Sequence, residues 1–167
     1  MSARVLAALP LAAALALPLG AAADTAAAGR HSSGDALLRA SDTEALLGIA
    51  RAYGSAEMDE TDPEDPFIAG TIDGILYSIY FQDCWGFAGC GSLLFHAGWT
   101  DAPVGRQHVN LWNRANRYGR AYIDQDDDPV IEMDVNMRYG LPIATFADSF
   151  DIWNSVLLSF RDDVIGR

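Results

Sequence analysis

The stretch FIAGTIDGILYSIYFQDC, residues 67–84, indicates how the chain folds. Two runs rich in β-branched and aromatic residues flank Asp73-Gly74, a dipeptide that favours a two-residue hairpin turn. Residues of the second run alternate between two faces, with Ile75, Tyr77, Ile79 and Phe81 on one and Leu76, Ser78, Tyr80 and Gln82 on the other. The sequence therefore predicts two antiparallel strands with one face against a core.

The chain's only two cysteines flank the next connection, CWGFAGC at residues 84–90. Cys84 ends one predicted strand and Cys90 begins the next, CGSLLFHAGW, so a hairpin loop brings them within disulfide reach. A redox pair has the spacing C-x-x-C, and a closed zinc site needs four ligands. Two reduced, buried thiols are the remaining alternative. We expect an intramolecular disulfide between Cys84 and Cys90.

The other elements follow from periodicity. Residues 41–54 predict a helix with Ser41 and Glu44 as a capping box, and the acidic, proline-containing segment 55–66 predicts an exposed loop. Residues 102–119 predict a helix, and residues 120–137 a second hairpin. Residues 141–160 predict an amphipathic helix with Pro142 in its first turn. Residues expected to face inward on the last two helices are Val109, Leu111, Trp112, Ala115, Ile143, Phe146, Phe150, Trp153, Leu157 and Phe160.

The predicted order is therefore α-β-β-β-α-β-β-α. Hairpins imply an antiparallel sheet, and alternation along its strands implies that one face is covered. The fold class that follows is an α+β two-layer domain with a five-stranded antiparallel sheet and helices on it.

The first 23 residues have the layout of a cleavable secretory signal peptide. Arg4 precedes an apolar run too short to span a membrane, and Ala21-Ala22-Ala23 fits a cleavage site. We expect a periplasmic protein that does not insert in the membrane after cleavage. Residues 24–40 are small and polar and predict a flexible linker, which leaves residues 41–167 as the folded domain.

Composition excludes some partners and shows no cofactor motif. The formal net charge of −12 argues against nucleic acid, because phosphate binding needs clustered Lys and Arg. The acidic run from Asp124 to Asp128 begins like a calcium loop, but Pro129 and Val135 stand where glycine and glutamate are required. Glu132 and Asp134 share a strand face, where exposed acids are commoner than catalytic pairs. We therefore expect no metal site, cofactor or catalytic residue.

The segment HVNLWNRANRYGRAYIDQDDDPVIEMDV, residues 108–135, is the most distinctive in the chain. With the cysteine hairpin and the aromatic C-terminal helix, it resembles the YbjN family, which is described as bacterial sensory transduction regulators. The matching elements are Asn110, Trp112, Asn113, residues 120–124 and residues 133–135. The resemblance implies a fold like that of type III secretion chaperones, which bind segments of other proteins and often form homodimers.

Two interpretations of the asparagine and tryptophan motif remain. Asn110, Trp112 and Asn113 are candidate binding residues, but Trp112 as a core anchor with Asn113 bonded to a neighbouring strand or loop is the favoured interpretation.

We expect a non-enzymatic binding or adaptor protein whose partner is a protein or peptide. Tyr80 and Leu76 are candidate anchors, being on the strand face opposite Ile75 and Tyr77. Which face the helices cover is not decided by the sequence. The alternatives are an envelope structural or stress-accessory protein without a ligand groove, and a thiol oxidoreductase.

Overall fold

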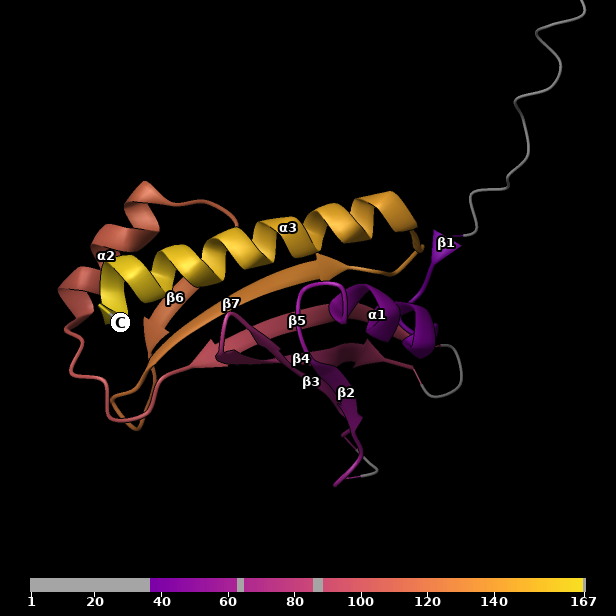
Figure 1. The fold of residues 1–167 in the computed structure, drawn as a ribbon, viewed down its shortest axis with the longest axis horizontal. Coiled ribbons are helices and arrows are strands. Elements are labelled where there is room, and N and C mark those ends of the chain that lie inside the picture. Colours follow the sequence, from indigo (N-terminus) through magenta and orange to yellow (C-terminus); the bar gives the residue numbers. More distant parts are fainter. Residues whose placement is uncertain (1–36, 63–64, 86–88, 167) are drawn as a thin grey trace, which may run out of the picture. The chain divides into compact units, whose positions relative to one another are not determined.

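The computed structural model describes residues 37–62, 65–85 and 89–166 (Figure 1). The signal peptide predicted at residues 1–23 and most of the predicted linker lie outside these residues. The elements, in chain order, are β1 (Leu37–Leu38), α1 (Thr43–Ala50), β2 (Ala56–Asp59), β3 (Phe67–Ile72), β4 (Ile75–Cys84), β5 (Cys90–Gly98), α2 (Arg106–Ala115), β6 (Arg120–Ile123), β7 (Pro129–Asn136), β8 (Leu141–Pro142), α3 (Ile143–Phe160) and η2, a π-helical turn (Arg161–Ile165).

The described residues form an α+β fold with a six-stranded antiparallel sheet in the order β2-β3-β4-β5-β7-β6. The predicted five-stranded sheet was one strand short, because the segment assigned to an exposed loop contains β2. Glu57 and Asp59 look like loop residues, but β2 pairs with β3 along its length and buries Ala56. Sheet pairing outweighs the weak strand preference of the acidic residues.

The β3–β4 hairpin confirms the prediction made from its turn. Asp73 and Gly74 both have positive φ angles, 51° and 77°, and Ile72 pairs directly with Ile75. Positive φ at both central residues gives a two-residue turn a twist that matches the right-handed twist of the flanking strands. The turn therefore sets the register in which Ile75, Tyr77 and Ile79 are all buried.

All three helices contribute to one core on a single face of the sheet. Phe146, Phe150 and Trp153 of α3 lie in it, and the Phe95 ring contacts all three of these rings at centroid distances of 5.1–6.4 Å. Figure 1 shows α3 lying along the sheet. The predicted inward positions of α3 are buried with one exception. Ile143 is 52% exposed because it begins the helix, beyond the edge of the core.

Helix α2 buries fewer residues than predicted. Val109 and Trp112 are in the core, whereas Leu111 and Ala115 are exposed. The helix has only ten residues, so one narrow stripe reaches the core and the two neighbouring positions turn toward solvent.

The folded region begins before the predicted boundary at residue 41. Leu37 and Leu38 pair with β8, and Leu38 and Ala40 are buried. The predicted capping box at α1 is also wrong, because the N-cap is Asp42 rather than Ser41. The Asp42 carboxylate instead accepts a hydrogen bond from the Arg39 backbone N–H, which ties β1 to the helix start.

Within the described residues, no helix is both long and apolar enough to cross a membrane.

Candidate binding face

The second face of the sheet is not covered by any helix of the described residues. The faces differ in burial, since Ile68, Ile79 and Phe95 on the helix side are fully buried, whereas their sequence neighbours are partly exposed. The structure thus answers the question that the sequence left open. Leu76 and Tyr80 project from the uncovered face, which we call the open face.

One cross-strand row of the open face combines apolar and acidic residues. The register aligns five strands in the order Asp59, Phe67, Tyr80, Leu94 and Asp134. The Phe67 and Tyr80 rings lie 5.3 Å apart between centroids. Directly opposed residues of antiparallel strands project from the same face. The row is therefore a stripe of three apolar residues with a carboxylate at each end.

Leu76 lies on the same face, four residues before Tyr80 in β4, and is 75% exposed. It pairs with Thr71 and lines a hollow of about 220 Å³, together with Ser55, Ala56, Glu57, Ala69, Gly70 and Thr71. A large aliphatic side chain held out on a regular strand has lost little water on folding, and its apolar area is available to a partner.

The carboxylates around the stripe differ in environment. Hydrogen bonds from Thr61 lower the pKa of Asp59, which favours its charged form. Glu132 is buried, contrary to the expectation of an exposed acid, because Arg120 and Tyr122 both donate hydrogen bonds to it. Burial and then the bond to Glu132 raise the pKa of Tyr122 to about 12. Asp134 is exposed and forms no ion pair within the described residues. After Glu132, its charge is a lesser cause that raises the pKa of Arg120.

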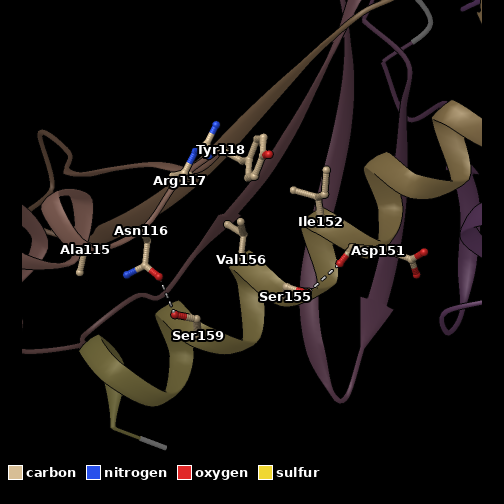
Figure 2. Close-up of a pocket in the computed structure, with 9 residues that line it drawn as sticks. All are labelled: Ala115, Asn116, Arg117, Tyr118, Asp151, Ile152, Ser155, Val156 and Ser159. Atoms are coloured by element: carbon tan, nitrogen blue, oxygen red, sulfur yellow. Dashed lines mark hydrogen bonds between the residues drawn. The ribbon is translucent and has the colours of Figure 1, made fainter.

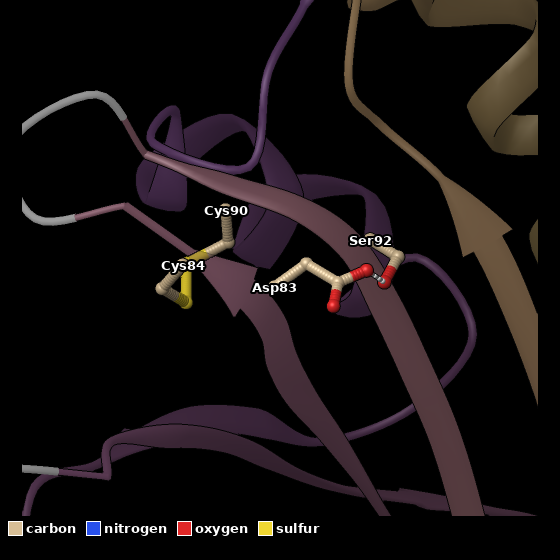
Figure 3. Close-up of a disulfide and its surroundings, with 4 residues drawn as sticks. All are labelled: Asp83, Cys84, Cys90 and Ser92. Atoms are coloured by element: carbon tan, nitrogen blue, oxygen red, sulfur yellow. Dashed lines mark hydrogen bonds between the residues drawn. A yellow bond between two sulfur atoms is a disulfide. The ribbon is translucent and has the colours of Figure 1, made fainter.

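The cysteines lie at the end of the β4–β5 hairpin (Figure 3). Cys84 and Cys90 are directly paired, their Cα atoms are 3.9 Å apart, and their sulfur atoms are at disulfide distance. The same end of the hairpin is held by a backbone hydrogen bond from Trp85 N–H to the Gly89 carbonyl. The pairing agrees with the prediction that these cysteines come from adjacent strands.

The three residues of the asparagine and tryptophan motif lie in different environments. Trp112 is buried against Phe160 and donates its indole N–H to Ser159. The Asn113 side chain bonds both the N–H and the carbonyl of Ala121 on β6. Asn110 is exposed. Trp112 and Asn113 thus have the packing and bonding that the structural interpretation expects.

A cavity of about 470 Å³ lies between α3 and the segment that follows α2 (Figure 2). Its lining includes Asp151, Ser155 and Ser159 of α3. Figure 2 shows Ser159 bonded to Asn116 across the cavity wall, at 3.4 Å. Sequence analysis missed this cavity, since its residues carry no motif and are brought together only by the packing of α3.

The acidic segment after β6 forms the turn of the second predicted hairpin. The Asp124 side chain accepts hydrogen bonds from the backbone N–H groups of Asp126 and Asp128, both at 2.9 Å. No group of three or more His, Cys, Asp or Glu side chains suited to a metal ion occurs in the part of the chain that the structure describes.

Comparison with protein families gives one match that covers most of the chain. The model of the family named YbjN, described as "Putative bacterial sensory transduction regulator", matches residues 42–166. The match includes the open face, the cysteine hairpin and all three helices. No curated protein matches the chain.

Proposed function

The chain belongs to the YbjN family, and on that premise we propose that it is an exported, non-enzymatic adaptor that binds a basic protein through its open face. The observation that carries this proposal is the row of Phe67, Tyr80 and Leu94 between Asp59 and Asp134. Apolar residues at the centre of a patch with charges at its rim are the usual anatomy of a protein interface.

Electrostatics favours a basic partner. The formal net charge is −12, and removal of residues 1–23 takes away Arg4 and no acid, which makes it −13. A field of this sign speeds encounter with a positively charged protein and repels acidic ones. Leu76 and Tyr80 act as the anchors, because Tyr80 lies at the centre of the row and Leu76 offers apolar area in the hollow that Glu57 also lines.

Site-specific photocrosslinking in intact cells tests the adaptor function. A photoreactive residue at position 76 is expected to capture one or a few discrete basic proteins, identified by mass spectrometry. Tyr139, 82% exposed and outside the sheet, provides the matched control position. Adducts of equal yield at both positions, or none at 76 while a small molecule or metal ion raises the melting temperature, would contradict the proposal.

Export has its own test. The short apolar run before Ala21-Ala22-Ala23 supports cleavage ahead of Asp24 and delivery to the periplasm. Intact-mass analysis of the protein from the cell envelope is expected to give a chain beginning near Asp24. A dominant species that retains Met1 would contradict export by this route.

A further inference from the structure

Half of strand β7 has an unpaired edge. β6 pairs with β7 only from Pro129 to Glu132, and no described strand pairs with the same side of Met133–Asn136. On its other side, β7 is paired with β5 throughout. The free half-edge begins where β6 begins, because Tyr118 has a left-handed φ of 70° and turns the chain away from the line of the strand.

The hydrogen-bond pattern identifies which backbone groups are free. Trp99 N–H bonds the Pro129 carbonyl, and Met137 N–H bonds the Gly91 carbonyl, so the odd-numbered residues of β7 bond toward β5. Backbone groups of successive strand residues point to opposite sides. The N–H and carbonyl groups of Asp134 and Asn136 therefore point to the unpaired side.

The other exposed flank of this end of the sheet is closed by a side chain. Asn113 bonds both backbone groups of Ala121, which occupies the outer edge of β6 in the way an added strand would. Natural sheets usually block their edges by such means, because unpaired edges recruit other chains. The edge at Asp134 and Asn136 has no equivalent cover among the described residues.

A cavity lies against the same half-edge. It measures about 320 Å³ and is lined by Met133–Asn136 of β7, Ser149 and Ile152 of α3, Leu141 and Tyr118. Its apolar part, from Met133, Val135, Leu141 and Ile152, lies on the helix side of the edge. An extended chain beside β7 would direct every second side chain into this cavity.

We propose that the β7 half-edge binds an extended peptide of another protein as an added antiparallel strand with alternating basic and apolar residues. The antiparallel direction continues the line of β6. Residues opposite Asp134 and Asn136 exchange backbone hydrogen bonds with them, and their side chains project on the open face beside the Asp134 carboxylate, where a basic residue is favoured. The residue between them places its apolar side chain in the cavity.

This peptide site shares Asp134 with the row on the open face but does not include the anchors Leu76 and Tyr80, so responses at Leu76 and Tyr80 distinguish the two proposals. The probe is a capped heptapeptide of alternating lysine and valine, titrated into the isotope-labelled protein. The amide signals of Asp134 and Asn136 are expected to shift saturably and to become protected from hydrogen exchange. Absence of saturable shifts at these amides up to about 1 mM peptide would overturn the proposal. Shifts confined to Leu76 and Tyr80 would overturn it too, while leaving the adaptor function standing.

Backbone methylation of the probe gives a matched pair. Methylating the lysine amides removes the donors that face β7, and binding is expected to weaken by roughly tenfold or more. Methylating the valine amides changes N–H groups that point away from β7, so it is expected to have little effect on binding of the peptide. Equal binding of the two methylated peptides would contradict strand addition.

The protein offers a second matched pair on α3. Ser149 and Ser155 both donate a hydrogen bond to the carbonyl four residues earlier, but only Ser149 lines the cavity at the β7 edge. Ser149→Phe is expected to fill the cavity and abolish binding of the lysine–valine peptide, whereas Ser155→Phe is expected to leave it unchanged. Unchanged binding by a folded Ser149→Phe variant would overturn the proposal.

Discussion

At the scale of single residues, Asn113 shows how a side chain can complete a sheet. Its amide satisfies the N–H and carbonyl of Ala121, which would otherwise be left unpaired at the outer edge of β6. An unpaired backbone group away from water carries a large free-energy cost, and a sequence motif alone does not distinguish this role from ligand binding.

Replacement of Asn113 tests that role. Asn113→Ala is expected to lower the free energy of unfolding by about 2–3 kcal/mol, because two hydrogen bonds are lost and both groups of Ala121 lose their partner. The control is Asn110→Ala on the exposed side of the same helix. This variant is expected to change the free energy of unfolding by less than about 0.5 kcal/mol. Urea denaturation measures both. Equal effects from the two variants would contradict the structural role.

The buried Tyr77 predicts how stability depends on pH. Burial raises the pKa of Tyr77 to about 12, and its hydroxyl has no hydrogen-bond partner among the described residues. The unfolded chain ionises first, near pH 10, so the contribution to stability is full below pH 10 and is lost between pH 10 and pH 12. The free energy of unfolding is therefore expected to fall over that range.

Tyr77→Phe separates this residue from others that titrate at high pH. The variant is expected to be more stable by about 1 kcal/mol below pH 10, because it removes an unpaired buried hydroxyl, and to lose less stability above pH 10. Tyr139→Phe, at an 82% exposed position, is the control. Denaturation curves between pH 7 and about pH 11.5 measure the difference. A Tyr77→Phe variant with an unchanged pH slope would contradict the account.

At the scale of elements, the sequence predicts those that have strong local signals, but it does not predict strands that form only because a distant segment pairs with them. The turn at Asp73-Gly74 and the alternation after it predict the β3–β4 hairpin correctly, and the 3–4 residue spacing of aromatic residues predicts α3. Strand β2 forms because its backbone can pair with that of β3, and no pattern within Glu57–Asp59 reveals this pairing. The same holds for β1, whose partner β8 is about a hundred residues away in the chain.

The open face was predictable only in part. Alternation in β4 assigns Leu76 and Tyr80 to the face opposite Tyr77, but the helices decide which face is covered. The alignment of Phe67, Tyr80 and Leu94 depends on the register of three strands, and the free half of β7 depends on a single left-handed residue, Tyr118. Neither feature is local in the sequence.

The cysteine hairpin gives a prediction for one element. A bond between Cys84 and Cys90 closes a small ring, so the double variant Cys84→Ala/Cys90→Ala is expected to lose only about 2 kcal/mol of unfolding free energy and to keep its fold. Urea denaturation with circular dichroism measures both quantities, with the reduced wild-type protein as control. Two free thiols titrated in the native protein would contradict the bond, and efficient turnover of a disulfide substrate would favour a thiol oxidoreductase instead.

At the scale of the whole molecule, one sheet presents two neighbouring surfaces that share Asp134. The open face carries an apolar stripe with acidic ends, and the β7 half-edge carries unpaired backbone groups above a cavity. Both lie in a strongly acidic chain, so the two proposals predict that charge guides approach to either surface while apolar contacts determine how long a partner stays bound.

The net charge predicts a clear response to salt. Raising the ionic strength from about 0.05 M to about 0.5 M is expected to weaken binding of the basic protein captured at position 76, mainly through a slower association rate. Surface plasmon resonance separates association from dissociation. A salt-independent association rate would contradict electrostatic steering.

The proposed adaptor function depends most directly on Leu76, a large aliphatic side chain that the open face exposes to solvent. The decisive measurement is the affinity of the captured protein for wild type and for Leu76→Ala, with melting temperatures recorded alongside. Binding is expected to weaken by roughly tenfold while the melting temperature stays unchanged, because the side chain contributes to the interface and not to the core. Equal affinity for wild type and Leu76→Ala would contradict the proposal that the open face binds the partner.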